Sequence, residues 1–128
     1  MELVLIRGLP GSGKSTMAKS MAGYDHYEAD MFFVRDGEYR YDAARIKDAH
    51  EWCQRKAREA LADGKRVVVS NTFTRRFEME PYFVMARAFG AGLRIVEATG
   101  KWENVHGVPE EVVERMRKRW EHVTHWIE

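Results

Sequence analysis

Short apolar runs alternate along the chain with longer segments in which apolar residues recur at helical spacing. The runs Glu2 to Ile6, Arg66 to Val69 and Leu93 to Glu97 have the length expected of buried strands. A shorter segment from His26 to Ala29, which ends at Asp30, predicts a further strand. The β-branched run at Arg66 to Val69 is typical of a central strand in a parallel sheet.

Four other segments carry helical patterns. The longest predicted helix runs from Asp42, a capping residue, to about Asp63. Others are expected from about Lys14 to Met21, from near Pro81 to Gly90, and from Pro109 onward. The apolar stripe predicted for the last helix consists of Val112, Met116, Trp120, Val123 and Ile127.

The order of these segments predicts an α/β fold. Strands that alternate with helices usually form a parallel sheet whose two faces are both covered. We therefore expect a central parallel sheet of about four to five strands with helices on both faces. The stretch from Thr99 to Val108 shows neither pattern and is expected to be a loop.

Length and composition suit one globular domain over residues 1–128. Hydrophobic residues make up 45% of the chain and charged residues 32%, which excludes a disordered protein. The 21 basic and 20 acidic side chains give a formal charge of +1. No global positive field would therefore hold a nucleic acid, and any contact with a polynucleotide must be local.

No segment has the pattern of a membrane span or a secretory signal. The apolar start, Met1 to Ile6, is interrupted by Arg7 well before the roughly 18 residues that a span needs. We therefore expect a cytoplasmic protein without membrane contact. Cys53 is the single cysteine, which excludes an internal disulfide and favours a buried, neutral thiol. No pattern indicates the oligomeric state.

A glycine-rich motif follows the first predicted strand. Residues 8–15 match the pattern G-x-x-x-x-G-K-[ST] between a strand and a helix. This placement lets backbone N–H groups surround a phosphate, and glycines permit the close approach. The predicted nucleotide-binding residues are Gly8, Gly11, Ser12, Gly13, Lys14, Ser15 and Thr16.

The motif predicts a P-loop NTPase or kinase fold that binds ATP or GTP with Mg²⁺. Lys14 would neutralise the β- and γ-phosphate oxygens, and the Ser15 hydroxyl would ligate Mg²⁺. The alternative is a glycine-rich turn whose lysine faces water. The presence of all four fixed positions between a strand and a helix argues against that alternative.

Polar residues follow the second and third predicted strands, at the edge of the sheet where ligands bind in such folds. Asp30 is the best-placed carboxylate to take the proton of an acceptor hydroxyl. A structural role, in which it caps the turn after the strand, is the alternative. Asn71 and Thr72 follow the third strand and are candidate substrate contacts.

Phosphoryl transfer also needs positive charge on the migrating group. Arg115 and Arg119 on the last helix are candidate catalytic residues, and Arg75 and Arg76 after the third strand are candidate substrate contacts. Each of them could instead be a surface arginine.

Four aromatic residues lie close together in the sequence after Asp30. Such side chains can stack on the bases of a single strand, although a place in the core is the favoured interpretation for most of them. The four residues are Phe32, Phe33, Tyr39 and Tyr41.

Beyond the P-loop, the sequence resembles the polynucleotide 5′-hydroxyl kinases of the P-loop kinase superfamily, which include the phage end-healing kinase and related vertebrate kinase domains. The resemblance covers nearly the whole chain, and its later blocks are more specific than the P-loop. The blocks are residues 8–16, 30–33, 37–42, 49–52, 70–72, 78–82 and 104–109.

The resemblance implies that Lys14 and Ser15 bind the nucleotide and the metal and that Asp30 activates a 5′-hydroxyl. It also implies that residues 99–119 form a short lid over ATP. The leading hypothesis is thus an ATP-dependent kinase that acts on a nucleic-acid end. A hydroxylated base in DNA, a small metabolite with a nucleotide-like hydroxyl, and a regulator that binds ATP without transferring phosphate remain alternatives.

Several positions depart from the phage kinase, and they concern the acceptor more than the donor. Met31 and Phe33 stand where that kinase has an aspartate and an arginine, although Arg35 lies nearby as a candidate substrate contact. Asn71 stands where it has an aspartate, and Lys101 replaces a matched arginine in the lid segment.

Overall fold

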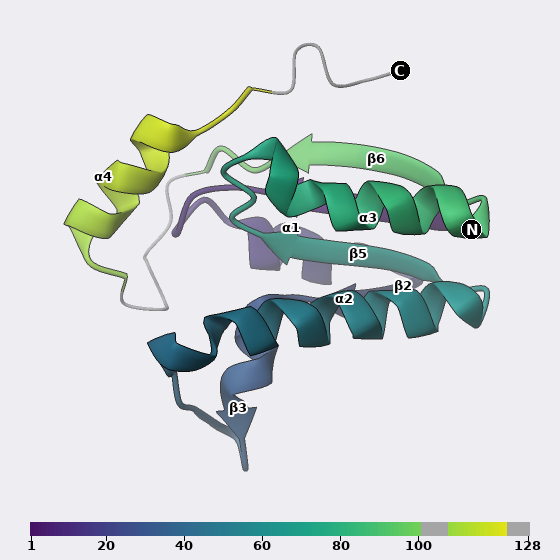
Figure 1. The fold of residues 1–128 in the computed structure, drawn as a ribbon, viewed down its shortest axis with the longest axis horizontal. Coiled ribbons are helices and arrows are strands. Elements are labelled where there is room, and N and C mark those ends of the chain that lie inside the picture. Colours follow the sequence, from purple (N-terminus) through teal and green to yellow (C-terminus); the bar gives the residue numbers. More distant parts are fainter. Residues whose placement is uncertain (101–107, 123–128) are drawn as a thin grey trace.

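A parallel β-sheet forms the centre of the molecule (Figure 1). The computed structural model describes residues 1–100 and 108–122. The strands of this sheet lie in the order β2–β5–β1–β6 and comprise β1 (Glu2–Arg7), β2 (Tyr24–Tyr27), β5 (Arg66–Asn71) and β6 (Gly92–Glu97). Leu5 lies opposite Val69 on one side and Ile95 on the other, and all neighbours run parallel. The structure confirms the predicted α/β fold.

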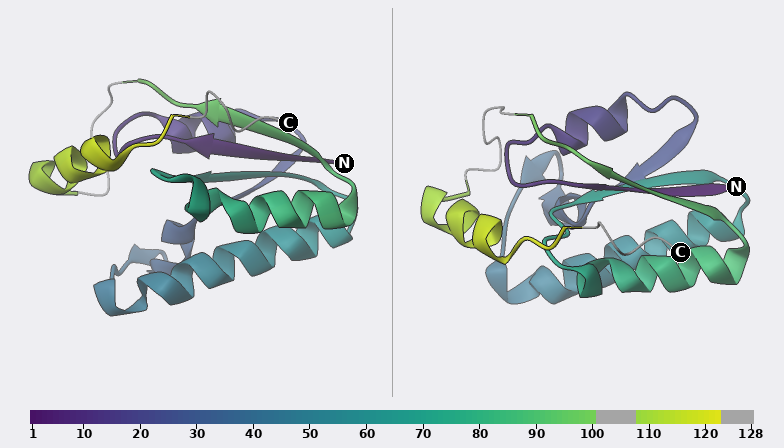
Figure 2. Two further views of the ribbon diagram at one scale, coloured as in Figure 1. Left: turned by 45° about the horizontal axis from the view of Figure 1, so that its top comes forward. Right: turned by 90° about the horizontal axis from the view of Figure 1, so that it is seen from above.

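Helices cover both faces of the sheet. The covering helices are α1 (Lys14–Lys19), α2 (Ile46–Ala62) and α3 (Arg76–Phe89), whereas α4 (Glu110–Arg119) lies beyond the carboxyl edge of the sheet (Figure 1). In Figure 2, α1 lies on one face of the sheet and both α2 and α3 lie on the other. Leu3 and Leu5 pack in the core shared with α2 and α3, whereas Val4 and Ile6 pack with Ala18 of α1. Because alternate residues of a strand point to opposite faces, a strand covered on both sides is apolar throughout.

The second strand lies slightly earlier in the chain than the sequence predicts. It spans Tyr24–Tyr27, where Tyr24 pairs with Arg66 and Tyr27 with Val69. A 3₁₀ turn, η1 (Ala29–Phe33), then takes the chain away from the sheet. The backbone N–H of Ala29 donates to Asn71 Oδ1 at 2.9 Å, and this bond fixes the departure of the chain.

Helix α3 begins at Arg76, earlier than the predicted start near Pro81. Glu78 explains the difference because its carboxylate accepts from the backbone N–H of Arg75 at 2.9 Å, which caps the first turn. Pro81 consequently lies inside the helix. Asp42 caps as predicted: it accepts from Ala44 N at 3.0 Å, at the start of a 3₁₀ turn, η2 (Ala43–Arg45), that leads into α2.

A short antiparallel hairpin, β3 (Val34–Arg35) and β4 (Glu38–Tyr39), was not predicted. Asp36 and Gly37 form its turn with φ of 52° and 79°. Both values lie in the left-handed region, which Asp-Gly pairs favour in two-residue hairpin turns. The Asp-Gly dipeptide is thus the feature of the sequence that could have revealed the hairpin.

Helix α4 ends at Arg119, so Trp120 of the predicted stripe lies outside it. Trp120 has an extended backbone with φ −60° and ψ 128°. Positions 123 and 127 of the stripe, and most of the loop predicted between Thr99 and Val108, fall outside the described residues. Within residues 1–100 and 108–122, no helix is both long and apolar enough to cross a membrane.

The core can be tested by truncating a side chain of the central strand. Leu5 is fully buried, so Leu5→Ala should lower the free energy of unfolding by about 2–5 kcal/mol. Leu93→Ala is the control, because Leu93 on β6 is 41% exposed and its truncation should cost less than about 1 kcal/mol. Urea denaturation of both variants gives the comparison, and equal losses would contradict the assigned burial.

Candidate active site

The glycine-rich loop joins the end of β1 to the start of α1. Gly11 and Gly13 have φ of 83° and 87°, a conformation that glycine adopts without strain. At Gly8, an added Cβ would collide with Ser12 Oγ and lie 3.0 Å from the carbonyl oxygen of Ala98. The path of the loop therefore depends on glycine at these three positions.

Ser12 is the residue that best tests whether the loop fits a phosphate. Its side chain is buried, and its Oγ has no hydrogen-bond partner in the described part of the chain. Buried polar groups are normally paired, so a lone hydroxyl donor beside a glycine cradle is suited to an oxygen-rich ligand. The residues present therefore fit a nucleotide phosphate.

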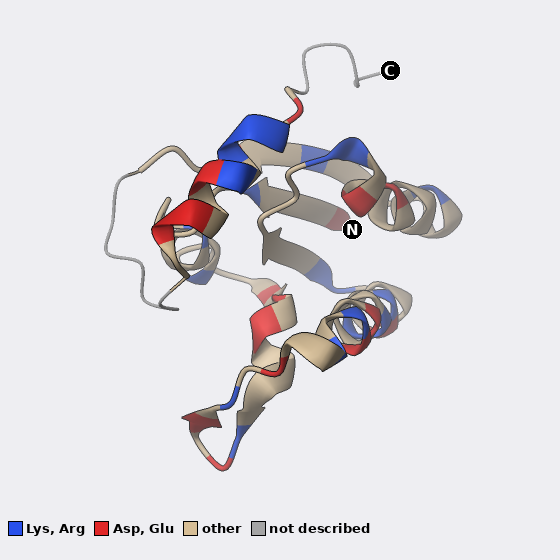
Figure 3. Ribbon diagram, turned by 60° about the vertical axis from the view of Figure 1, so that its left-hand side comes forward, with Lys and Arg blue, Asp and Glu red and all other residues tan. Residues whose placement is uncertain are grey.

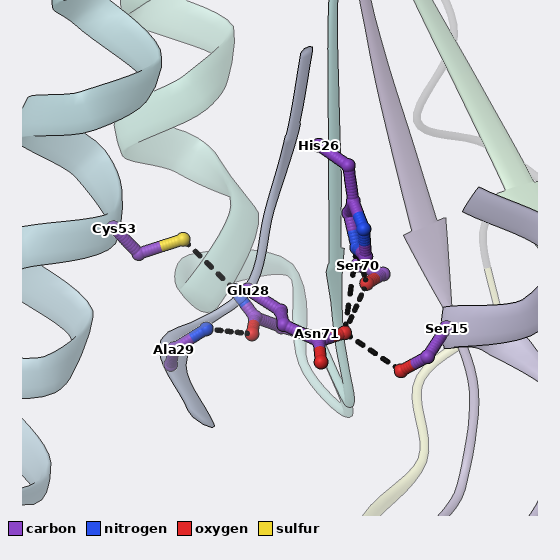
Figure 4. A network of polar contacts seen from close by, with 7 residues as sticks. All are labelled: Ser15, His26, Glu28, Ala29, Cys53, Ser70 and Asn71. Atoms are coloured by element: carbon purple, nitrogen blue, oxygen red, sulfur yellow. Dashed lines mark hydrogen bonds and ion pairs between the residues drawn. The ribbon is translucent and has the colours of Figure 1, made fainter. Parts of the chain in front are cut away.

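A network of polar contacts lies directly beside the loop (Figure 4). Ser15 Oγ and Ser70 Oγ each donate to Glu28 Oε2 at 2.7 Å. His26 Nε2 lies 2.8 Å from Ser70 Oγ and 3.4 Å from Glu28 Oε2. One carboxylate thus connects α1, the end of β2 and the end of β5.

The network holds Glu28 in its ionised form. Burial by itself would raise the pKa of Glu28, but hydrogen bonds from His26, Ser15 and Ser70 outweigh it and lower the pKa to about 2. A carboxylate that is charged at neutral pH and bonded to a hydroxyl is a suitable cation ligand.

Ser15 and Glu28 are the residues that could hold Mg²⁺. Their oxygen atoms are of the type that Mg²⁺ prefers, and Mg²⁺ in nucleotide sites usually takes its remaining ligands from phosphates and water. Consistent with this, no cluster of three or more His, Cys, Asp or Glu side chains occurs among residues 1–100 and 108–122. The donor set fits a metal that arrives with a nucleotide.

Lys14 lines the same cavity as the carboxylates Glu28 and Asp30. Burial lowers the pKa of Lys14, and the negative charges of Glu28 and Asp30 oppose this shift. The ammonium group is therefore placed in partly desolvated surroundings, where its attraction to phosphate oxygens is less screened than in water.

Asp30 lies in η1 and accepts a hydrogen bond from the Tyr39 hydroxyl at 3.0 Å. Burial and the Asp30 carboxylate both raise the pKa of Tyr39, so its hydroxyl stays a donor. Asn71 fixes the start of the same turn through Ala29, and its amide nitrogen lies 3.8 Å from Cys53 Sγ. Cys53 itself is fully buried, as predicted, and burial raises the pKa of its thiol to about 11.

A cavity of about 460 Å³ brings many of the predicted residues together. It lies at the carboxyl edge of the sheet, on the side where α4 is seen in Figure 1. The predicted site residues that line it are Lys14, Ser15, Asp30, Asn71, Thr72 and Arg119. Of these residues, Asp30, Asn71 and Thr72 were predicted from strand ends, Lys14 and Ser15 from the glycine-rich motif, and Arg119 from the last helix.

The other predicted arginines lie outside the lining of this cavity. Arg35 is exposed on the hairpin, and Arg75 is exposed at the start of α3. Arg76 uses its backbone N–H to donate to Glu121 Oε1 at 2.8 Å. Arg115 is exposed on α4, whose first turn is acidic and whose last turn is basic (Figure 3).

Arg7 anchors α4 to the sheet although it lies at the end of an apolar strand. It is fully buried, and its guanidinium donates to the carbonyls of Phe73 at 2.7 Å and Glu121 at 2.7 Å. The same group lies 3.8 Å from the centre of the Trp120 ring. Nearby, Arg119 Nε donates to Thr74 Oγ1 at 3.2 Å, so the end of α4 is held against the loop that follows β5.

Glu28, His26 and Arg7 were missed by sequence reasoning. Glu28 precedes Asp30 by one intervening residue, and this pair of acids after a strand could have been read as a site with two carboxylates. His26 belongs to the strand itself and has no distinguishing pattern. Arg7 could have been noticed because a cation ends a strand that is otherwise apolar.

Comparison with known proteins identifies the family of the chain. A family model described as an AAA domain, AAA_33, matches residues 3–123. The chain is 31% identical over 133 residues to human NEDD4-binding protein 2, a match that covers 93% of this chain and 8% of that protein. It is 30% identical over 131 residues to an uncharacterized protein of Pasteurella multocida (strain Pm70), covering 89% of this chain and 73% of that protein.

Solved structures share the fold at low sequence identity. A chain of the Pnkp1/Rnl/Hen1 RNA repair complex matches with a TM-score of 0.73 and 15% identity, covering 99% of this chain and 46% of that chain. A gluconokinase from Sinorhizobium meliloti 1021 matches with a TM-score of 0.67 and 20% identity, covering 98% and 78%. The Mycobacterium tuberculosis APS kinase CysC matches with a TM-score of 0.55 and 19% identity, covering 89% and 66%.

The family match spans nearly the whole chain, and these structural neighbours share its sheet and helices. The chain therefore belongs to the AAA_33 family of AAA domains. It also shares its fold with solved kinases.

Proposed function

We propose that the chain is an ATP- or GTP-dependent phosphotransferase that uses Mg²⁺ and moves the γ-phosphate to a hydroxyl acceptor. The observation that carries this proposal is that Lys14, Ser15, Glu28 and Asp30 line one cavity at the carboxyl edge of the sheet. A phosphate loop, a cation ligand and a candidate general base are the parts that phosphoryl transfer requires. Their meeting in one cavity favours a kinase over a protein that only binds nucleotides.

The phosphates of the donor would lie in the loop of residues 8–15. Backbone N–H groups and the Ser12 hydroxyl supply donors there, and Lys14 supplies the positive charge. Mg²⁺, when bound, would neutralise phosphate oxygens, and Ser15 and Glu28 would hold it. These residues would hold the terminal phosphate in the cavity that Asp30 also lines.

A second cavity, of about 610 Å³, suits the nucleoside part of the donor. It borders the same loop and is lined by residues 9–12 and 97–100 together with Glu110, Val113 and Trp120 of the α4 region. Because the loop separates the two cavities, a triphosphate that follows the loop would place its base on one side and its γ-phosphate on the other.

Asp30 would act as the general base. As the acceptor oxygen forms its bond to the γ-phosphorus and the bond to the leaving nucleoside diphosphate breaks, Asp30 would take the proton of the acceptor hydroxyl. The hydrogen bond from Tyr39 orients the carboxylate for this step. Arg119 lines the same cavity and is the candidate for stabilising charge on the migrating group.

The first acceptor we propose is the 5′-hydroxyl of a polynucleotide. The sequence blocks shared with polynucleotide 5′-hydroxyl kinases support it, and a chain of an RNA repair complex is among the structural neighbours. A hydroxylated base in DNA or a small metabolite is the alternative. The formal charge of +1 favours the small metabolite, because it offers no general field for a long polyanion.

A regulator that binds ATP without transferring phosphate is less well supported. It is suggested by Asn71, which brings no charge to the end of β5. Glu28 offers a carboxylate to the same place, because it accepts a hydrogen bond from the neighbouring Ser70. A charged ligand for the metal is thus available despite Asn71.

Transfer from labelled ATP to a panel of 5′-hydroxyl DNA, 5′-hydroxyl RNA and nucleosides tests the proposal. Asp30→Asn should lower the rate of transfer by about 10²–10⁴-fold, since it removes the proton acceptor, and should leave ATP affinity nearly unchanged. Asp63→Asn, at the exposed end of α2, is the control. Labelling of nucleosides alone would remove the polynucleotide acceptor, and full activity of Asp30→Asn would remove the role of Asp30.

Gly8→Ala should weaken nucleotide binding by at least about tenfold, because the new Cβ collides with Ser12 Oγ and forces the phosphate loop to shift. Gly92→Ala is a matched control, since its Cβ would meet nothing closer than the Met1 carbonyl oxygen at 4.0 Å. Titration with a fluorescent ATP analogue measures both variants. Equal affinities for the two would show that the loop does not cradle the phosphates.

Stability should depend on pH through Glu28. Its pKa is about 2 in the folded protein and near 4.5 in an exposed chain, so its contribution is complete above about pH 5. The contribution is lost as the pH falls from about 4.5 to about 2, and it is on the order of 3 kcal/mol. Urea denaturation should therefore show wild type more stable than Glu28→Gln at pH 7, with the difference shrinking toward pH 3. A difference that is constant with pH would contradict the paired, ionised carboxylate.

A further inference from the structure

The hairpin and the segment directly after it place two tyrosine rings in the cavity that contains the candidate base. Tyr39 is 41% exposed and Tyr41 is 55% exposed, and both line the cavity that contains Asp30. Each ring packs against the buried Phe33, with centroids 6.3 Å and 5.2 Å away. The rings are therefore supported by Phe33 and still present free aromatic surface at the mouth of the cavity.

The surroundings of these rings are largely apolar. Ile46, which is 39% exposed, lines the same cavity near the start of α2. The region of α4 contributes further apolar side chains to the lining, namely Val108, Pro109, Val112 and Met116. A flat hydrophobic group entering the cavity would thus find apolar partners from the hairpin and from α4.

The charges that line the cavity disfavour an anionic group near the tyrosines. Glu28, Asp30 and Glu78 are carboxylates, and burial lowers the pKa of His50 although the charges of Glu78 and Asp30 oppose this shift. Among the lining residues of the described chain, the permanent cations are Lys14, which belongs to the phosphate loop, and Arg119 on α4. No lysine or arginine of the hairpin or of α2 lines the cavity.

We propose that Tyr39, Tyr41 and Ile46 form a stacking surface that binds the uncharged planar base of the nucleoside whose hydroxyl is phosphorylated. Aromatic side chains stack on bases of any sequence, so this surface would recognise a terminal nucleoside without reading which base it carries. The acceptor hydroxyl of that nucleoside would then lie beside Asp30, which is bonded to Tyr39. This inference rests on the proposed function and identifies the base of the acceptor nucleoside as the part that this surface binds.

Comparing two oligonucleotides isolates the contribution of the terminal base to acceptor binding. Both are single-stranded DNA with a free 5′-hydroxyl and the same phosphates, but one carries an abasic sugar analogue as its 5′-terminal residue. With wild-type protein we expect the KM for the abasic strand to be higher by roughly 5- to 100-fold, with a smaller change in kcat. Equal KM values for the two strands would overturn the stacking surface.

Variants of Tyr41 provide the second half of the test. Tyr41→Ala should raise the KM for the normal strand toward that of the abasic strand and should barely change the latter, whereas Tyr41→Phe should preserve the wild-type pattern. Phe77→Ala is a matched control, because Phe77 is 65% exposed on α3 and does not line the cavity. A Tyr41→Ala variant that still distinguished the two strands would also overturn the proposal.

Measuring nucleoside binding directly tests the stacking surface independently of the proposed kinase activity. If no strand is phosphorylated although ATP binds, the kinase proposal fails, and thymidine and adenosine can still be titrated against wild type and Tyr41→Ala by saturation-transfer NMR. Binding that is lost in Tyr41→Ala and kept in Tyr41→Phe supports the stacking surface on its own. Absence of nucleoside binding to wild type, or binding that is unchanged in Tyr41→Ala, rejects it.

Discussion

The candidate site is organised around one partly buried carboxylate, Glu28, that remains charged. Glu28 accepts hydrogen bonds from Ser15 and Ser70 and lies beside His26, and these partners belong to α1, β5 and β2. A charge that is withdrawn from water is stable only while its hydrogen bonds are intact. Because the partners of Glu28 come from three elements, its hydrogen bonds link the positions of α1, β5 and β2. The shape of the phosphate loop and the edge of the sheet are thereby coupled.

Arg7 links separate elements near α4, as Glu28 does beside the glycine-rich loop. Burial lowers the pKa of its guanidinium, while the negative charges of Glu97, Glu78 and Glu121 oppose the shift. Its hydrogen bonds to backbone carbonyls tie the end of β1 to the loop after β5 and to the segment after α4. Since α4 contributes to both cavities, the position of this one cation affects the walls of each.

The fold alone does not select the acceptor. A gluconokinase, an APS kinase and a chain of an RNA repair complex share this architecture at 20% identity or less. Function on a shared fold is decided by the side chains that line the site. In the function that we propose, the acceptor would lie among the lining residues near the hairpin and on α4, so those two elements would decide between hydroxyl acceptors.

The sequence by itself determined the sheet, the position of the glycine-rich loop and the place of Asp30 at the edge of the sheet, because apolar periodicity and glycine spacing are local properties of the chain. It also located α2, whose cap and core face lie within one segment. Only the tertiary structure decided that Glu28 meets Ser15 and Ser70, that Arg7 reaches Glu121, and which arginine lines the cavity. Those contacts join residues far apart in the chain, and their geometry follows from how strands and helices pack rather than from any local pattern.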